Sequence, residues 1–374
     1  METNMTYSFQ MAAKDAPYEY RRPPVDLTRG WAGLSSATAA VARFDSVAAG
    51  LPAALKGVTY RDLLFRMEAS SSSAIEGVEA SARQLIMDEV LAGTEESVSR
   101  DEQVREAARS LAAIHAAVDL PARRPITPSF LFAIHALLMQ GVAGAHPGKF
   151  RQPPYVGYAA GRPAVDSKLV PKCMDDLLGF MAEDPGPEGP LVRVAIAHAL
   201  FELIHPFHDG NGRMGRLLMP LHLMRAGATT ESNLVLSGQL YVHREDYRQL
   251  LANLHKRGTT EDWVAWVEFM LGVMREQALE HAAFFRLIRK RFDEISEATL
   301  EAAGQRAAGH LLPRFLASPA FTVPSIMGEE NRVTVHKWIE KLVAAKVIKV
   351  ERAGVRRRAT IYLCPGLMNL LGRK

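Results

Sequence analysis

The residues with the clearest capacity for chemistry lie in one segment, HPFHDGNGRMGR, at residues 205–216. His205 has the side chain whose unperturbed pKa, about 6.5, suits a general base near neutral pH. Asp209 offers a carboxylate oxygen of the kind that binds Mg²⁺ beside phosphates. Arg213 and Arg216 are three residues apart, so both can hold phosphate oxygens from the first turn of a helix. This combination of base, metal ligand and arginines indicates chemistry on a polyphosphate.

The small residues between these side chains predict an anion-binding turn. Pro206 cannot extend the apolar helix expected before it, so His205 should lie at the end of that helix. Gly210, Asn211 and Gly212 tolerate a positive φ, which allows successive backbone N–H groups to converge on an anion. The next helix is expected to start directly afterwards, and its N-terminal dipole would add to the attraction.

Three other interpretations of this segment explain less of it. Residues 210–215 match the dinucleotide fingerprint GxGxxG, but that fingerprint follows a strand, whereas this segment follows an apolar helix. A plain helical turn with arginines facing solvent leaves the ordered His, Asp and Arg residues unexplained. A zinc site lacks the HExxH arrangement and would place arginines beside a cation. Its ligands would be His198, His205, His208 and Asp209.

The elements that must position these residues are mostly helices. Apolar residues dominate 191–204, directly before the site, and predict a buried helix. Between 141 and 170 glycines and prolines interrupt the helical pattern, and two short β-favouring pieces around Tyr155 and Ala164 indicate a loop or a hairpin. Further helices are expected at 31–49, 60–91, 101–118, 128–140, 170–183, 243–257, 261–282 and 284–303.

Length and composition limit the class of protein. A chain of 374 residues suggests two or three domains, and 48% hydrophobic with 23% charged residues is typical of a soluble globular protein. Two cysteines cannot form a disulfide scaffold or a four-thiolate zinc site. No apolar run reaches the roughly 18 residues of a membrane-spanning helix, and the N-terminus lacks a secretory pattern. We therefore expect a cytoplasmic protein without a membrane contact.

The segment 305–374 differs in charge from the rest of the chain. It carries 13 Lys and Arg against 4 Asp and Glu, a net charge of +9, whereas the other residues carry −5. A helix at 307–317, two helices around a glycine turn, and two strands joined by a basic turn at 356–358 predict a winged helix-turn-helix. Its charge leaves two partners open, duplex DNA or another protein.

The segment at 205–216 resembles the signature of the Fic-domain family, HPFx[D/E]GNGRxxR, at every defined position. HPGKFR at 146–151 and YVGYAAGRPAV at 155–165 resemble the start and body of the family's substrate-docking hairpin, the flap. RMEASSSSAIEGVEA at 66–80 resembles the family's N-terminal region. The resemblance covers about residues 15–290 and implies a mainly α fold, with a Fic-type helical core and a small β-hairpin flap, followed by the winged helix-turn-helix domain.

The resemblance implies transfer of AMP from Mg-ATP to a hydroxyl group of a target protein, with release of pyrophosphate. His205 would be the catalytic base, Asp209 would hold Mg²⁺, and Arg216 would hold the γ-phosphate. The target would dock on the flap as an added strand. Tyr241 and Tyr247 lie where the family often lines its adenine pocket. The residues implied to bind ATP are Phe207, Asp209, Gly210, Asn211, Gly212, Arg213, Arg216 and Tyr241.

A second motif concerns regulation. Ser72, Glu76 and Gly77 match the family's inhibitory pattern [S/T]xxxE[G/N]. On a helix, Ser72 and Glu76 would lie one turn apart on the same face. The resemblance implies that Glu76 pairs with Arg216 and so leaves ATP bound unproductively. The alternative is a surface helix that begins at a serine N-cap, with Glu76 in solvent.

We therefore expect three domains: residues 1–100 with the inhibitory motif at 72–77, a Fic core at 101–304, and a winged helix-turn-helix at 305–374. The Fic core would contain the flap at about 150–166 and the catalytic loop at 205–216. The leading hypothesis is a self-inhibited protein adenylyltransferase. One alternative is a DNA-binding regulator whose Fic core only senses nucleotide, and another is an enzyme that removes AMP in the same pocket. The sequence leaves open the target, the acceptor residue, self-modification and a homodimer.

Overall fold

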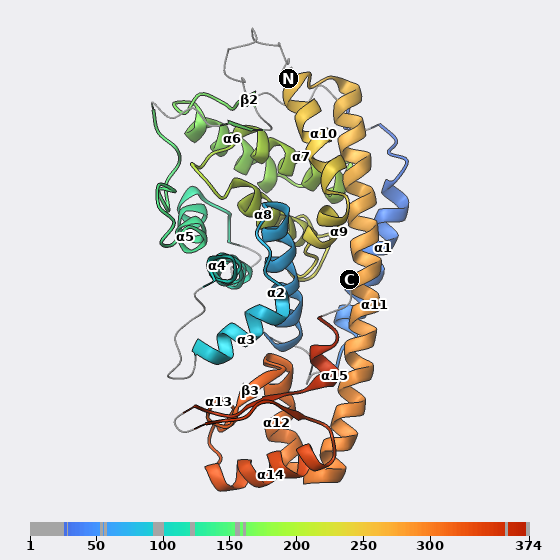
Figure 1. Cartoon of the computed structure of the whole chain (residues 1–374). Coiled ribbons are helices and arrows are strands. Elements are labelled where there is room, and N and C mark those ends of the chain that lie inside the picture. Colours follow the sequence, from blue (N-terminus) through green and yellow to red (C-terminus); the bar gives the residue numbers. More distant parts are fainter. Residues whose placement is uncertain are drawn as a thin grey trace. The chain divides into compact units, whose positions relative to one another are not determined.

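The structure is a computed structural model, and its secondary structure is mostly helical, as the sequence predicts (Figure 1). Its contacts divide the chain into two compact units, which we call the first unit (residues 1–45 and 109–280) and the second unit (residues 46–108 and 281–374). The division into three domains stays a prediction. The residues described are 26–27, 29–52, 55, 58–92, 101–119, 124–153, 158–159, 162–355 and 358–371.

The first unit is built around one buried helix, α7 (Gly189–Ile204). Thirteen of its sixteen residues are buried, as expected for a helix that is apolar on all sides. The indole N–H of Trp266 donates to the backbone oxygen of Ala195, 2.8 Å away. The other helices wholly in this unit are α5 (Pro128–Leu138), α6 (Val170–Ala182), α8 (Asn211–Arg225), α9 (Ser237–Val242) and α10 (Arg244–Lys256).

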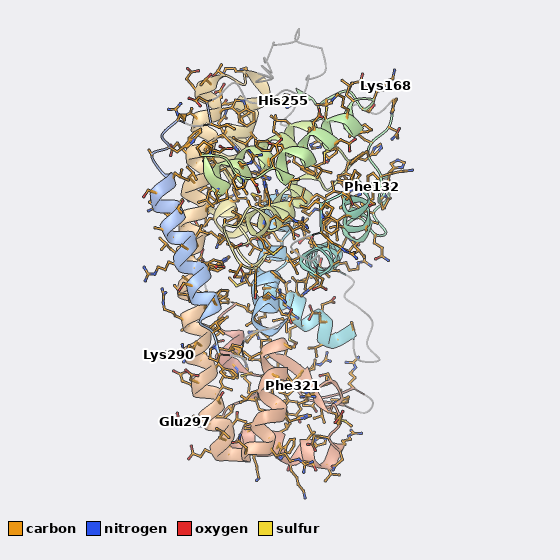
Figure 2. All side chains as sticks on the ribbon, turned by 180° about the vertical axis from the view of Figure 1, so that it is seen from behind. Phe132, Lys168, His255, Lys290, Glu297 and Phe321 are labelled. Atoms are coloured by element: carbon orange, nitrogen blue, oxygen red, sulfur yellow. The ribbon has the colours of Figure 1, made fainter. Side chains whose placement is uncertain are left out.

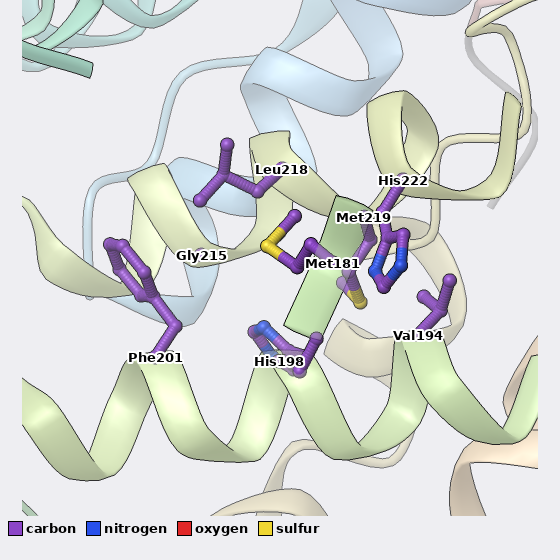
Figure 3. Close-up of a pocket in the computed structure, with 9 residues that line it drawn as sticks. Met181, Val194, His198, Phe201, Gly215, Leu218, Met219 and His222 are labelled. Atoms are coloured by element: carbon purple, nitrogen blue, oxygen red, sulfur yellow. The ribbon is translucent and has the colours of Figure 1, made fainter. Parts of the chain in front are cut away.

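Helices α7 and α8 approach closely where α8 carries Gly215. A Cβ atom at this position would meet the Glu202 carboxylate, a ring carbon of Phe201 at 3.0 Å and the His198 ring at 3.2 Å. Figure 3 shows Val194, His198 and Phe201 on α7 facing the residues of α8. A small cavity remains between the helices. It is lined by Met181, Val194, Ala197, His198, Phe201, Gly215, Leu218, Met219 and His222.

The hairpin expected between 150 and 166 is present. Strands β1 (Tyr158–Ala159) and β2 (Arg162–Pro163) pair antiparallel, with Tyr158 opposite Pro163. The predicted β-favouring residue Tyr155 lies outside the described residues, whereas Ala164 is buried directly after β2.

Three helices contribute residues to both units: α1 (Leu34–Ala49), α4 (Glu102–Val118) and α11 (Thr260–Ala303). Helix α11 corrects the prediction of two helices at 261–282 and 284–303, because neither Pro nor Gly interrupts the sequence between them. Of the described helices, none is both long and apolar enough to cross a membrane.

In the second unit, the helix predicted at 60–91 is two helices, α2 (Val58–Ile75) and α3 (Ala82–Ala92). Gly77 adopts a φ of +86°, and the N–H of Val78 donates to the oxygen of Ser73 at 3.0 Å. This 6→1 bond with a left-handed glycine is a Schellman helix end. Gly77 therefore ends α2, which periodicity alone did not reveal.

The C-terminal segment contains α12 (Gln305–Ala317), α13 (Val323–Ile326), α14 (Arg332–Ala344) and α15 (Pro365–Met368). Its sheet has three antiparallel strands in the order β3-β5-β4, where two were predicted. Strand β3 (Ala320–Thr322) is the addition, and β5 (Ile361–Leu363) lies between it and β4 (Lys349–Arg352). Phe321 is buried, while Lys290 and Glu297 lie on exposed positions of α11 (Figure 2).

Candidate active site

His205 marks the C-terminal end of α7, as predicted from Pro206. Its backbone is left-handed, with φ 51° and ψ 61°, and its N–H still donates to the oxygen of Phe201 at 3.0 Å. Such a conformation is uncommon for a residue other than glycine and needs support from its surroundings. The helix therefore stops at the candidate base itself, and the chain turns there into the loop at 206–210.

The buried side chain of Phe207 fixes this loop against α5. Its side chain is fully buried, and its ring stacks on the imidazole of His135 with 3.9 Å between centroids and 10° between planes. The ring of Phe150 lies 5.5 Å away. Phe207 thus anchors the loop through its buried ring, while a contact with ATP remains a prediction.

His135, on α5, joins this loop to the chain before the hairpin. The N–H of Gly148 donates to Nδ1 at 3.0 Å, so Nδ1 is the acceptor and the proton lies on Nε2. Nε2 then donates to the backbone oxygen of Asp209, also at 3.0 Å. Burial lowers the pKa of His135, which favours this neutral form. His135 therefore fixes two backbone segments at once.

The Asn211 side chain fixes the loop on its other side. Its Oδ1 accepts from the N–H of Phe207 at 2.8 Å, and its Nδ2 donates to the oxygen of Phe207 at 3.0 Å. The Asn211 amide group is thus used within the loop, and anion binding by its backbone N–H stays a prediction.

Of the three residues expected to permit a positive φ in the turn into α8, Gly210 adopts one, whereas Asn211 and Gly212 are the first two residues of the helix. Gly210 is left-handed, with φ 74° and ψ 10°, and precedes the first residue of α8. Its N–H donates to the Asp209 carboxylate at 2.6 Å. The N–H groups in the first turn of α8 and the helix dipole favour a negatively charged ligand there.

The two arginines of the segment are both on α8 and both buried, Arg213 with 6% of its surface exposed and Arg216 with 1%. The guanidinium of Arg213 lies 3.9 Å from the carboxylate of Asp209, whose side chain is 56% exposed. The α8 helix thus brings the Arg213 guanidinium close to the carboxylate of the loop.

The sequence model of the Fic/DOC family matches residues 125–223, and that of the Fic/DOC family N-terminal region matches residues 31–119. This chain is a member of the Fic/DOC family. The solved structures agree: a Fic family protein from Desulfovibrio desulfuricans G20 superposes with a TM-score of 0.57 at 23% identity, over 92% of this chain and 98% of that chain. Caenorhabditis elegans Fic-1 gives a TM-score of 0.52 at 20% identity, over 67% of this chain and 72% of that chain. At these identities the likeness shows the fold.

Short segments of this Fic protein are more similar to curated relatives. Over 38 residues it is 58% identical to the protein adenylyltransferase fic-1 of Caenorhabditis elegans, which is 10% of this chain and 8% of that relative. Over 103 residues it is 37% identical to the protein adenylyltransferase Fic of Culex quinquefasciatus, which is 27% of this chain and 20% of that relative. The matches therefore span a small part of these relatives.

The residues of the Fic loop fit Mg²⁺ better than zinc. Mg²⁺ is commonly held by one or two carboxylates together with phosphates and waters, and the exposed Asp209 carboxylate suits that role. Among the described residues, no three His, Cys, Asp or Glu side chains form a group that could hold a metal. His198, proposed in the zinc alternative, is buried, and its Nε2 lies 2.9 Å from the Tyr247 hydroxyl.

The two tyrosines considered for the adenine pocket differ in environment. Tyr247 is 3% exposed and contacts His198 in the core of the first unit. Tyr241 is partly exposed, and the guanidinium of Arg244 lies 5.0 Å from its ring centroid. Tyr241 is the one of the pair whose ring reaches the surface, and its contact with adenine stays a prediction.

The inhibitory motif lies in the second unit, at the end of α2. Ser72 is buried within the last turn, and Glu76 is exposed and follows the last helical residue, Ile75. Both residues therefore lie at the C-terminal end of α2, directly before the turn at Gly77, and the placement of their side chains on one helical face stays a prediction. Ser72 is inside α2, so it is not the N-cap of the alternative interpretation.

Sequence reasoning missed three residues that shape the loop: His135, Arg151 and Gly215. The contact partners of each residue lie in other segments of the chain, and a single sequence does not identify those partners. A sequence signal existed for Gly215, because a glycine inside an apolar helix often marks a close helix approach. His135 could have been flagged as a histidine within the strongly apolar segment FLFAIHALL.

Proposed function

We propose that this protein transfers AMP from ATP to a hydroxyl side chain of a target protein. The observation that carries the proposal is the loop at 206–210, which joins His205 at the end of α7 to the first turn of α8, where the N–H groups favour an anion. Membership of the Fic/DOC family and the names of its relatives support the same reaction.

In the proposed reaction, His205 accepts the proton of the target hydroxyl as its oxygen attacks the α-phosphorus. The bond from the α-phosphorus to the bridging oxygen breaks, and pyrophosphate leaves with that electron pair. The N–H groups in the first turn of α8 stabilise the charge on the phosphate oxygens, and Arg213 and Arg216 hold the remaining phosphates. Most of the catalysis is then positioning and charge stabilisation, for which a rigid loop is suited.

Asp209 would hold Mg²⁺, which when bound neutralises phosphate charge. The Asp209 carboxylate is the acidic group of the loop, and its exposure leaves it accessible to a Mg-nucleotide. Asp209→Ala should therefore lose Mg²⁺-dependent turnover. Turnover that depends on zinc and ignores Mg²⁺ would contradict the polyphosphate interpretation.

The remaining proposals concern partners. An extended segment of the target would add to the hairpin β1–β2, and ATP would occupy the loop at the start of α8. Glu76 would restrain the reaction, so that the protein is self-inhibited. Self-modification and a homodimer belong to the same proposal, because the acceptor hydroxyl can come from a second copy of the chain. We also propose a cytoplasmic location.

For the C-terminal segment, we propose a winged helix-turn-helix that contacts duplex DNA. Arg332, Lys337 and Lys341 are exposed on α14 beside Val333, which is 65% exposed. Cationic side chains suit phosphates, and an exposed apolar group suits a thymine methyl. Arg356 and Arg357 lie outside the described residues. Binding of the full chain to duplex DNA should weaken steeply with salt, and a chain that ignores DNA but crosslinks to a protein would favour the interface role.

The experiment that tests the main proposal supplies a cell lysate and the Glu76→Gly protein with ATP carrying a label on either the α- or the γ-phosphate. AMP transfer predicts protein bands that are absent from lysate incubated without the added chain and that are labelled from the α-phosphate alone. Labelling from the γ-phosphate would indicate a kinase. Loss of AMP from a pre-labelled target, without new labelling, would favour the enzyme that removes AMP.

A further inference from the structure

Arg151 is almost completely buried, with 1% of its surface exposed, and it contacts the candidate base through the backbone. Its Nε donates to the carbonyl oxygen of His205 at 2.7 Å, and its terminal nitrogen donates to the oxygen of Ile204 at 3.2 Å. Its own N–H donates to the oxygen of Pro206 at 2.9 Å. Three consecutive carbonyl groups around His205 therefore point to a single residue.

The same guanidinium also reaches the far side of the hairpin. Its terminal nitrogen donates to the carbonyl oxygen of Val165, which lies two residues after β2. Arg151 itself precedes β1 in the chain. The side chain therefore joins the two ends of the hairpin and connects both to the end of α7.

The chemistry of these contacts suits an arginine specifically. The carbonyl groups at the C-terminal end of α7 carry partial negative charge from the helix dipole, so a cation there is favoured. A planar guanidinium can donate to several acceptors in fixed directions, whereas a lysine amine acts as a point charge. The direction of the His205 carbonyl depends on its left-handed ψ, so the Nε bond directly restrains that conformation.

We propose that Arg151 is a positioning residue that keeps His205 in its left-handed conformation and sets the base of the hairpin in register with it. This inference rests on the proposed function, in which a target segment docks on the hairpin and His205 accepts its proton. A hydroxyl group presented from the hairpin would then approach the base at a fixed place, which matters because small misplacements cost large factors in rate.

The test compares Arg151→Lys with Arg193→Lys in the full chain carrying Glu76→Gly, which removes the proposed self-inhibition. Arg193 is a matched control because it is also buried, at 5% exposure, and lies on α7, the helix whose end Arg151 contacts. Its guanidinium donates to the carboxylates of Glu188 and Glu183 and to the oxygen of Phe180. Loss of a buried arginine should reduce stability in both variants. Only a positioning role predicts that Arg151→Lys also raises hydrogen exchange in the segments 164–170 and 203–208 beyond the rise in Arg193→Lys.

Two readouts are measured: hydrogen exchange of peptides that cover 164–170 and 203–208, and the kcat and ATP KM of AMP transfer. For Arg151→Lys we expect exchange in both peptides to rise by about tenfold or more. We expect kcat to fall by at least about tenfold, with the ATP KM within about twofold, because ATP binds at α8. If Arg151→Lys does not fold, Arg151→Gln, which keeps an amide donor, replaces it.

Equal hydrogen exchange of the two peptides and equal kcat in Arg151→Lys and Arg193→Lys would overturn the proposal. So would faster exchange at one of the two segments alone, because the segments would then not be joined by Arg151. If the Glu76→Gly chain, in which the proposed restraint is removed, transfers no AMP to any protein, the proposed function fails. The exchange measurement then still decides whether Arg151 couples the hairpin to His205.

Discussion

His135 Nε2 donates to the backbone oxygen of Asp209 over 3.0 Å, across 74 residues of sequence. The opposite ring nitrogen accepts from Gly148, and the ring face covers Phe207. One neutral imidazole thus determines the path of the loop that carries the candidate metal ligand.

Replacement of His135 should weaken the binding of Mg-ATP. His135→Gln keeps an amide donor near the place of Nε2, whereas His135→Asn keeps an acceptor near the place of Nδ1 and loses the bond to Asp209. We expect the Asn variant to bind Mg-ATP more weakly than the Gln variant and to lose about 1–3 kcal/mol of unfolding free energy. Calorimetric titration and urea unfolding measure the two quantities. Equal affinity in both variants would mean that the ring stack alone matters.

Gly215→Ala should destabilise the first unit by about 1–3 kcal/mol, because its methyl group would press on Phe201 and His198. The matched control is Gly179→Ala, inside α6, where a Cβ atom would meet nothing within 4 Å. That change should be neutral or stabilise by up to about 1 kcal/mol. Thermal unfolding compares them, and an equal effect of the two changes would contradict the close packing of α7 and α8.

Acid should destabilise the first unit through two buried histidines. Burial lowers the pKa of His198 and of His222 to about 3, against about 6.5 in the unfolded chain. Between these values the unfolded chain binds protons that the folded chain does not, so stability falls as the pH drops below about 6.5. Each histidine contributes up to about 1.4 kcal/mol per pH unit.

The measurement is urea unfolding between pH 7 and pH 4.5, comparing the wild-type chain with His222→Gln. The free energy of unfolding of the variant should fall less steeply as the pH drops, by up to about 1.4 kcal/mol per pH unit, because one titrating histidine is missing. A slope that is unchanged in His222→Gln would mean that this side chain is protonated in the folded state or is accessible to water.

Local features of the fold followed from the sequence, and distant contacts did not. The apolar α7 helix, its end at Pro206 and the hairpin at β1–β2 each depend on neighbouring residues, so pattern and proline chemistry were sufficient. The break after Ile75 was missed, because an apolar pattern continues across it and Gly77 is permitted in a helix at modest cost. His135 could not be placed against Asp209, because only the packing of α5 brings them together.

Glu76→Gly should increase AMP transfer by about tenfold or more, because the proposed pairing of Glu76 with Arg216 would then no longer keep Arg216 from the γ-phosphate. Arg216→Ala should be inactive, and the double variant should stay inactive, because the restraint would act through the missing arginine. Initial rates with labelled ATP measure all three variants. Unchanged transfer in Glu76→Gly, or equal activation without Arg216, would leave residues 72–77 as only a helix end.

The central claim, that His205 is the base for AMP transfer, is tested most directly by intact mass spectrometry of the Glu76→Gly chain with and without His205→Ala. Both proteins are incubated with Mg-ATP and lysate proteins, and ATP binding is measured in parallel. The account predicts a mass increase of one AMP group per modified site with His205 present. With His205→Ala it predicts no increase although ATP still binds. Full AMP transfer by the His205→Ala chain would contradict the account.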